Sequence, residues 1–183
     1  GCLTAQGQVW EEWVALYNGL GNYDDDAQSV VGDNSGNAYI TGWSTGIVTN
    51  KDYATIKYNS MGQQQWVARY HYGTDMAYSI ALDGVGNVYV TGESESDYAT
   101  IKYNTDGEQQ WIVRYGLQDH EDVSNCVATD RDGNIYVTGH SWGSGTGYDY
   151  ASIKYDSSGQ QLWVARYNGP GNTSDFATNL ALD

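Results

Sequence analysis

The sequence has few basic residues, and this shortage argues against nucleic-acid binding. Only eight Lys and Arg stand against 23 Asp and Glu, so the formal net charge is −15. Six of the eight recur at fixed positions of a repeat, which leaves no basic stripe for a phosphate backbone. No apolar run reaches the length of a transmembrane helix, and the negative charge would be repelled by an anionic lipid surface. We therefore expect neither a nucleic-acid partner nor membrane insertion.

Cysteine is nearly absent, which argues against a disulfide framework and a cysteine-based metal site. The two cysteines, Cys2 and Cys126, show no C-x-x-C spacing. Cys126 falls in an apolar strand motif, where we expect a buried free thiol. Gly1-Cys2 could be the end of a bacterial lipoprotein processing site, or a pair without special meaning.

Helix-forming residues are scarce, whereas turn and strand residues are plentiful. The chain has one Pro and one Phe, against 17 Tyr, 7 Trp and 23 Gly in 183 residues. Tyr and Trp suit a half-buried pleated surface, and Gly is common in tight turns. The composition therefore predicts an all-β protein.

Four short motifs recur in a fixed order along the chain. G-N-x-Y-[IV]-T-G occurs at Gly36–Gly42, Gly86–Gly92 and Gly133–Gly139, with spacings of 50 and 47 residues. D-Y-A-[TS]-I-K-Y occurs at Asp52–Tyr58, Asp97–Tyr103 and Asp149–Tyr155. W-[VI]-[AV]-R-Y occurs at Trp66–Tyr70, Trp111–Tyr115 and Trp163–Tyr167, with a divergent copy at Trp13–Tyr17. D-x-[AS]-x-x-[VIL]-x-x-D starts at Asp25, Asp75, Asp122 and Asp175.

Each motif has the alternation of a β-strand. Val88 and Val90 alternate with Tyr89 and Thr91, which is the period of two of a pleated strand. Turn signals such as Asp83–Asn87 separate the motifs and favour hairpins. Four short strands per unit of this length are typical of a β-propeller blade.

We expect a tail at residues 1–8 and a β-propeller of four-stranded antiparallel blades at 9–183. The array should contain a strand at 9–17, blades at about 25–70, 75–115 and 122–167, and the first strand of a further blade at 175–183. This makes about three and a half blades, labelled with strands A to D in each blade. Because repeats bury apolar faces against neighbours, we expect either part of a longer ring or a ring completed by copies of the chain.

The charges that recur in every copy are interpreted as part of the blade architecture, since an enzyme needs one constellation and not three equivalent ones. Neighbouring C and D strands can pair Lys or Arg with the recurrent Asp residues. These charges are Asp52, Lys57 and Arg69, then Asp97, Lys102 and Arg114, then Asp149, Lys154 and Arg166.

The Asp-rich turns are candidates for calcium binding. Asp130 and Asp132 resemble part of a D-x-D-x-D-G loop, but no Glu closes the site downstream. The equivalent turns at 33–37 and 83–87 lack the middle Asp. We interpret all three as hairpin turns and keep Asp130 and Asp132 as the calcium candidates. No other cofactor is expected.

Positions that differ between copies are the better candidates for binding. Trp43, Glu93 and His140 follow T-G in successive units, and Trp142 lies two residues beyond His140. We place these side chains at B–C loops of unequal length, where aromatics suit a sugar or protein partner or cover the underside of the loop. The histidines have no repeated Ser, Cys or metal-ligand companion, so none is predicted to be catalytic.

The combined motifs D-x-x-G-N-x-Y-V-T-G, D-Y-A-T-I-K-Y and W-V-A-R-Y-N-G resemble the SBBP repeat, the seven-bladed β-propeller repeat of bacterial and archaeal proteins. The resemblance extends from Val9 to the end of the chain. It implies a propeller fold and a secreted or cell-surface location, often within large multidomain proteins. The family has no general catalytic motif to carry over, and this chain has about half the blades that the family name suggests.

From these features we expect a non-enzymatic, secreted or cell-surface scaffold for structural or protein interactions, which includes self-assembly through exposed blade faces. One alternative is a carbohydrate-binding module that uses Trp43 and Trp142. Another is part of a larger enzyme whose active site lies outside this segment.

Overall fold

The computed structural model describes residues 11–116 and 120–183, in which twelve strands form three four-stranded antiparallel sheets. The first sheet is β1 (Asp25–Gly32), β2 (Ala38–Thr45), β3 (Lys51–Tyr58) and β4 (Gln64–Tyr70). The second is β5 (Asp75–Leu82), β6 (Val88–Ser94), β7 (Asp97–Tyr103) and β8 (Gln109–Tyr115). The third is β9 (Val123–Thr129), β10 (Ile135–Gly143), β11 (Gly147–Tyr155) and β12 (Gln161–Tyr167).

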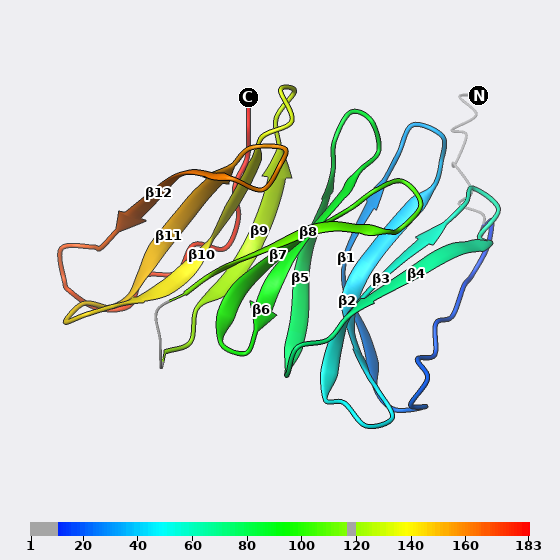
Figure 1. Ribbon diagram of the computed structural model, residues 1–183, viewed down its shortest axis with the longest axis horizontal. Coiled ribbons are helices and arrows are strands. Elements are labelled where there is room, and N and C mark those ends of the chain that lie inside the picture. The colour runs from blue at the N-terminus through cyan, green and yellow to red at the C-terminus, as the bar shows by residue number, and fades with distance from the viewer. Residues whose placement is uncertain (1–10, 117–119) are drawn as a thin grey trace, which may run out of the picture.

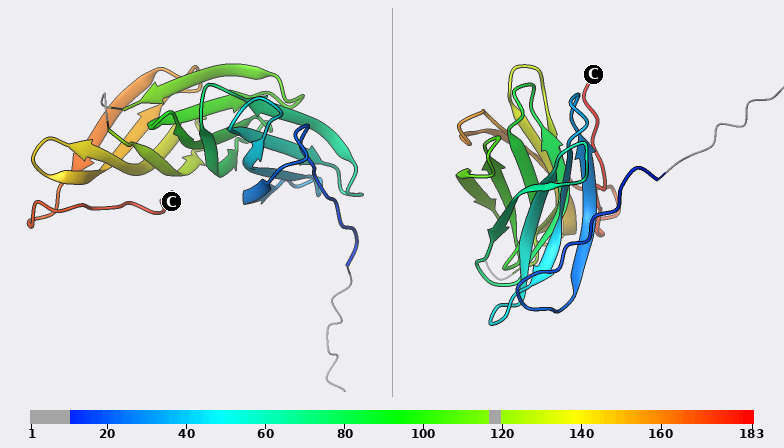
Figure 2. Two further views of the ribbon diagram at one scale, coloured as in Figure 1. Left: turned by 90° about the horizontal axis from the view of Figure 1, so that it is seen from below. Right: turned by 90° about the vertical axis from the view of Figure 1, so that its right-hand side faces the viewer.

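Each sheet contains one copy of the four motifs, in the order A, B, C, D from one edge to the other. The three sheets stand side by side in the same orientation (Figure 1), and they follow one another along a curved arc (Figure 2). The inner A strands β1, β5 and β9 neighbour one another across the blades. The expected all-β fold of propeller blades is therefore confirmed. No helix in the described residues is long and apolar enough to cross a membrane.

The strands predicted at 9–17 and 175–183 are not formed within the described residues, so this part of the prediction is wrong. A D strand pairs with the C strand that precedes it, and an A strand pairs with the B strand that follows it. Within residues 11–116 and 120–183 neither segment is paired with such a strand, so their backbones form no ladder there. Trp13 nevertheless packs near Tyr58, with ring centroids 6.0 Å apart, as the equivalent Trp66 packs near Tyr103.

The core lies between the blades. One face of each blade carries aromatic side chains and meets the aliphatic face of the next blade. Tyr39 and Tyr53 of the first blade pack with Val88, Val90 and Ile101 of the second. The second interface repeats this arrangement with equivalent residues: Tyr89, Tyr98, Ile135, Val137 and Ile153. All of these side chains are buried.

Polar bridges cross the same interfaces. The Tyr53 hydroxyl donates a hydrogen bond to the Ala99 carbonyl in the next blade at 3.2 Å. The Trp66 indole donates to the Thr105 carbonyl at 3.0 Å. Tyr98 and Trp111 make the equivalent bonds from the second blade to the third. These bonds fix the register of one blade on the next, because they are directional where apolar packing is not.

The glycine of each T-G pair lies directly against the backbone of strand A. A bulge between Ala77 and Ser79 shifts the register of β5 on β6, and it brings the Met76 carbonyl against Gly92. A side chain at Gly92 would overlap that carbonyl oxygen. Gly42 and Gly139 have the same relation to their own A strands. The repeated glycine is therefore a packing requirement of the blade.

We expect Gly92→Ala to lower the free energy of unfolding by about 2 kcal/mol or more, because the new methyl group must displace backbone. Gly84→Ala is the control, since a methyl group there meets nothing within 4 Å. Equilibrium denaturation of both variants is the measurement. Equal stability of the two variants would contradict this account of the glycine.

Candidate functional site

The repeated arginines and aspartates form the expected ion pairs between neighbouring C and D strands. The distances are 2.8 Å for Arg69–Asp52, 3.1 Å for Arg114–Asp97 and 3.3 Å for Arg166–Asp149. Each arginine also donates to a B-strand serine and to the tyrosine hydroxyl that ends the preceding D segment, namely Tyr17, Tyr70 and Tyr115. Each arginine thus links its own blade to the segment before it.

The prediction allowed Lys or Arg as the partner of these aspartates; the arginines are the partners, and the repeated lysines do not pair with them. Asp52 and Lys57 stand at opposite ends of β3, so one cannot reach the partner of the other. Lys57 lies instead 5.1 Å from the ring centroid of Tyr39 on β2. Lys102 and Lys154 repeat this cation–π contact with Tyr89 and Tyr136. The repeated lysines therefore stabilise the blade and are not interpreted as residues of a binding pocket.

The turn that contains Asp130 is held by its own carboxylate. Oδ1 accepts hydrogen bonds from the backbone amides of Asp132 and Asn134, and Oδ2 accepts from the Asn134 amide and the Tyr136 hydroxyl. Asp33 and Asp83 make the same set of bonds in turns that lack the middle Asp. The common carboxylate therefore closes the hairpin, and nothing in this turn favours Asp130 or Asp132 as a calcium ligand.

The side chains that differ between blades adjoin one another at the end where the B–C and D–A connections lie. Trp43, Glu93, His140 and Trp142 belong to strands β2, β6 and β10, and not to loops as the sequence analysis placed them. The B strands continue further than the T-G motif indicates, because they stay paired with the C strands as far as Thr45 and Gly143. All four side chains are half-buried.

Contacts connect these side chains from the first blade to the second. The Lys51 ammonium lies 4.0 Å from the Trp43 ring centroid and 3.6 Å from the Met76 sulfur. The Tyr78 hydroxyl lies 3.6 Å from the same sulfur. Burial together with the Glu93 and Glu121 carboxylates raises the pKa of Tyr78 to about 12.

The charge at this end is mainly negative. Burial raises the pKa of Glu93, nearby Glu121 raises it further, and Lys51 opposes the shift. Burial lowers the pKa of His140, while Glu121 and Asp122 oppose that shift. The neighbouring carboxylates thus reinforce the effect of burial on the pKa of Glu93 and oppose it on the pKa of His140.

An aromatic group continues the surface on the third blade. His140 meets Phe176 and Tyr148 edge to face, with ring centroids 4.7 Å and 5.2 Å apart. Trp142 stacks on His120 at 4.6 Å and meets Tyr148 at 5.3 Å. The His140 Nδ1 atom is buried without a hydrogen-bond partner. We call the line formed by Trp43, Lys51, Met76, Tyr78, Glu93, Glu121, His140, Trp142, Tyr148 and Phe176 the variable row.

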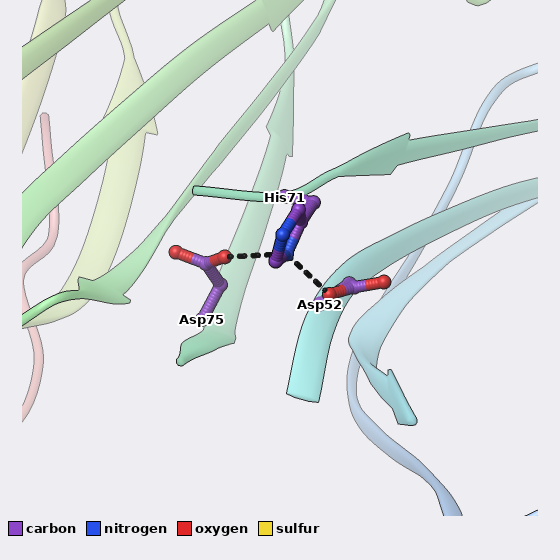
Figure 3. A group of neighbouring side chains, drawn as sticks. All are labelled: Asp52, His71 and Asp75. Carbon is purple, nitrogen blue, oxygen red and sulfur yellow. Dashed lines mark hydrogen bonds and ion pairs between the residues drawn. The ribbon is translucent and has the colours of Figure 1, made fainter. Parts of the chain in front are cut away.

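One cluster was missed by the sequence analysis. Asp52, His71 and Asp75 meet at the junction of the first two blades (Figure 3). His71 Nδ1 is 2.9 Å from Asp52 Oδ1 and 3.9 Å from Asp75 Oδ2. A signal was present in the sequence, because His71 follows the R-Y pair where other copies have Asn or Gly. It could be recognised only once the two recurrent aspartates were known to meet at that residue.

Cys126 lies in β9 as a free, half-buried thiol that contacts the Asn179 amide oxygen at 3.0 Å. The thiol is thus less buried than expected, because an A strand leaves alternate side chains outside the blade interface. Cys2 and the tail at residues 1–8 lie outside the described residues.

The family comparison agrees with the architecture. Residues 66–99 and 110–145 match the family described as SBBP, a beta-propeller repeat. Among solved structures, the chain is similar to a luciferin-regenerating enzyme, with a TM-score of 0.46 and 10% sequence identity. That similarity covers 78% of this chain and 45% of the enzyme chain. A search of curated proteins finds no match.

We expect the turn carboxylates to make the protein less stable in acid. Partial burial opposes the shift, but hydrogen bonds from Asn87, Val85 and Tyr89 lower the pKa of Asp83. A depressed folded pKa contributes stability above the unfolded value, and this stability is lost as pH falls through the folded value. Asp83→Asn should therefore cost about 1 kcal/mol at neutral pH, through lost hydrogen bonds, and progressively less in acid.

Denaturation of wild type and variant between about pH 7 and pH 2 is the measurement, since the unfolded Asp pKa is about 3.9. Asp106→Asn is the control, because its turn uses the backbone amide of residue 106. A stability difference for Asp83→Asn that stays constant at all pH values would contradict this assignment.

Proposed function

We propose that this chain, which carries SBBP β-propeller repeats, is a non-enzymatic, extracytoplasmic scaffold that binds a partner protein through the variable row. The observation that carries the proposal is a difference between the side chains that recur in every blade and those that vary from blade to blade. The repeated charges make the same structural contacts in every copy. The side chains that differ between blades lie together at one end.

The chemistry of the variable row suits a protein surface. It combines aromatic faces, a thioether and carboxylates, and aromatic residues and Met are enriched at protein interfaces. Rings such as Trp43 and Tyr148 are already held by neighbours, so little side-chain freedom is lost on binding. The strongly acidic composition keeps such a scaffold soluble and favours a partner with a basic surface.

A carbohydrate ligand is the second candidate. The observation in its favour is that Trp43 and Trp142 both stand half-buried at the same end, on different blades. Tryptophan faces suit stacking against sugar rings. Against this candidate, Trp142 already stacks on His120.

The test compares two surface variants of the whole chain. The double variant Trp43→Ala with Glu93→Gln changes the variable row, whereas Val85→Ser changes an exposed residue in an A–B turn at the opposite end. Partners are identified by crosslinking with mass spectrometry and by a glycan array. Loss of a protein partner with the double variant, and its retention with Val85→Ser, supports the proposal.

Three results would overturn it. A glycan ligand lost in the double variant, without a protein partner, supports the carbohydrate alternative. A hydrolytic or lyase activity of the chain that Glu93→Gln abolishes shows an enzyme. Equal partner binding by all variants shows that the variable row is not the contact surface.

The scaffold also presents a groove on the face of the first blade that points away from the second blade, where the segment containing Trp13 and Tyr17 lies beside buried side chains of the blade. Ala54, Ile56 and Tyr58 of that face are the repeat equivalents of residues that the first blade covers on the second: Ala99, Ile101 and Tyr103. A groove of about 710 Å³ lies over this face, and Val30 on its rim is 67% exposed. Because its lining repeats residues that a neighbouring blade covers elsewhere in the chain, the groove suits a blade of the same repeat from a second copy of the chain.

We expect the purified chain to sediment above its monomer mass of 20.1 kDa at high concentration. Val30→Lys should shift this equilibrium toward monomer, because it places a charge in the apolar contact. Sedimentation velocity of both proteins is the measurement. A wild-type chain that stays monomeric would remove self-assembly from the proposed function and leave the binding role of the variable row untouched.

A further inference from the structure

The junction between the first two blades brings three potential metal ligands within reach of one ion. One ligand atom from each of Asp52, His71 and Asp75 can be chosen so that all three lie within 4.8 Å of one another. A tetrahedral Zn²⁺ with bonds of about 2.1 Å holds its ligand atoms about 3.4 Å apart. The His71 distances of 2.9 Å to Asp52 and 3.9 Å to Asp75 bracket that spacing.

The surroundings of the two carboxylates favour the binding of a cation. Asp75 is fully buried, and its Oδ1 atom accepts no hydrogen bond. Its Oδ2 atom accepts from the backbone amides of Tyr72 and Gly73, which hold the carboxylate in place. An ion bound to this carboxylate would stabilise a buried charge that the described contacts compensate only in part.

Asp52 is oriented by groups that leave one oxygen for the site. Its side chain is 5% exposed, and Oδ2 accepts from Arg69 at 2.8 Å and from Thr49 at 2.9 Å. Oδ1 faces His71. Such outer contacts to a ligating carboxylate are usual around bound metals, because they fix its direction. The two carboxylates outnumber the one guanidinium, so the cluster carries a net negative charge.

His71 is what distinguishes this junction from the others. The next junction also has two aspartates, Asp97 and Asp122, but Gly116 stands at the histidine position. In the third blade the position is held by Asn168. The aspartates are therefore part of the repeat, whereas the imidazole is present only between the first and second blades. Its side chain is 48% exposed, so an ion can enter from solvent.

We propose that Asp52, His71 and Asp75 bind one divalent transition-metal ion, with Zn²⁺ as the best fit to two carboxylate oxygens and one imidazole nitrogen. Asp52 and His71 belong to the first blade and its outgoing connection, and Asp75 begins the second blade. The bound ion therefore cross-links the two blades, and solvent water completes its coordination. The site shares no residue with the variable row.

The experiment titrates Zn²⁺ into the chelator-treated whole chain by calorimetry and follows thermal unfolding with and without the ion. We expect one ion per chain and a higher unfolding temperature, since a ligand that binds only the folded state stabilises it. His71→Asn should weaken binding by more than about tenfold and remove the thermal shift. Asparagine is compatible with the fold at this position, because residues 18 and 168 are Asn in equivalent positions.

His120→Asn is the matched control, since it removes an exposed histidine elsewhere and should keep both the binding and the thermal shift. Co²⁺ gives a second measurement, because its visible absorption reports the ligand set directly. The proposal is overturned if the wild-type chain binds no Zn²⁺ at one-to-one stoichiometry. It is equally overturned if His71→Asn binds as wild type does, or if His120→Asn loses the ion.

Discussion

The structure depends on one constraint, which is that each blade buries its apolar faces against neighbouring blades. Val90 and Ile101 are completely buried in a core cluster to which the preceding blade contributes Tyr39 and Tyr53. Burial of a side chain of this size contributes about 1.5 to 3 kcal/mol, and the interface repeats several such contacts. We therefore expect an individual blade to be unstable without its neighbours.

This constraint explains which residues recur. The tyrosine of D-Y-A reaches a carbonyl of the next blade, the tryptophan of the D strand reaches the next C–D turn, and the arginine reaches the tyrosine of the segment before it. Each of these residues is needed once at every interface, and so appears once in every unit. Residues that no interface requires are free to differ, and these are the residues from which a specific function can be built.

Much of the fold and part of the candidate site could be predicted from the sequence. The strands, their order and the hairpin turns follow from local alternation and from Asp, Asn and Gly at the turns. The Arg–Asp pairs follow from the neighbouring positions of strands C and D. The sequence left open whether Lys or Arg is the partner of each aspartate, and the structure selects Arg because Asp52 and Lys57 lie at opposite ends of a strand. Trp43 and Trp142 were placed on loops because paired strands can continue into polar, glycine-rich sequence.

The sequence by itself determined the blade as a unit, because alternation, turns and cross-strand pairs are local properties of a chain. Only the tertiary structure decided which side chains of different blades meet. The pKa of Glu93 in the second blade depends on Lys51 of the first blade and on Glu121 before the third, and Asp75 lies beside Asp52 and His71. Such contacts depend on the distance and angle at which one blade packs on the next. Those quantities are set by the whole buried interface and by no single motif.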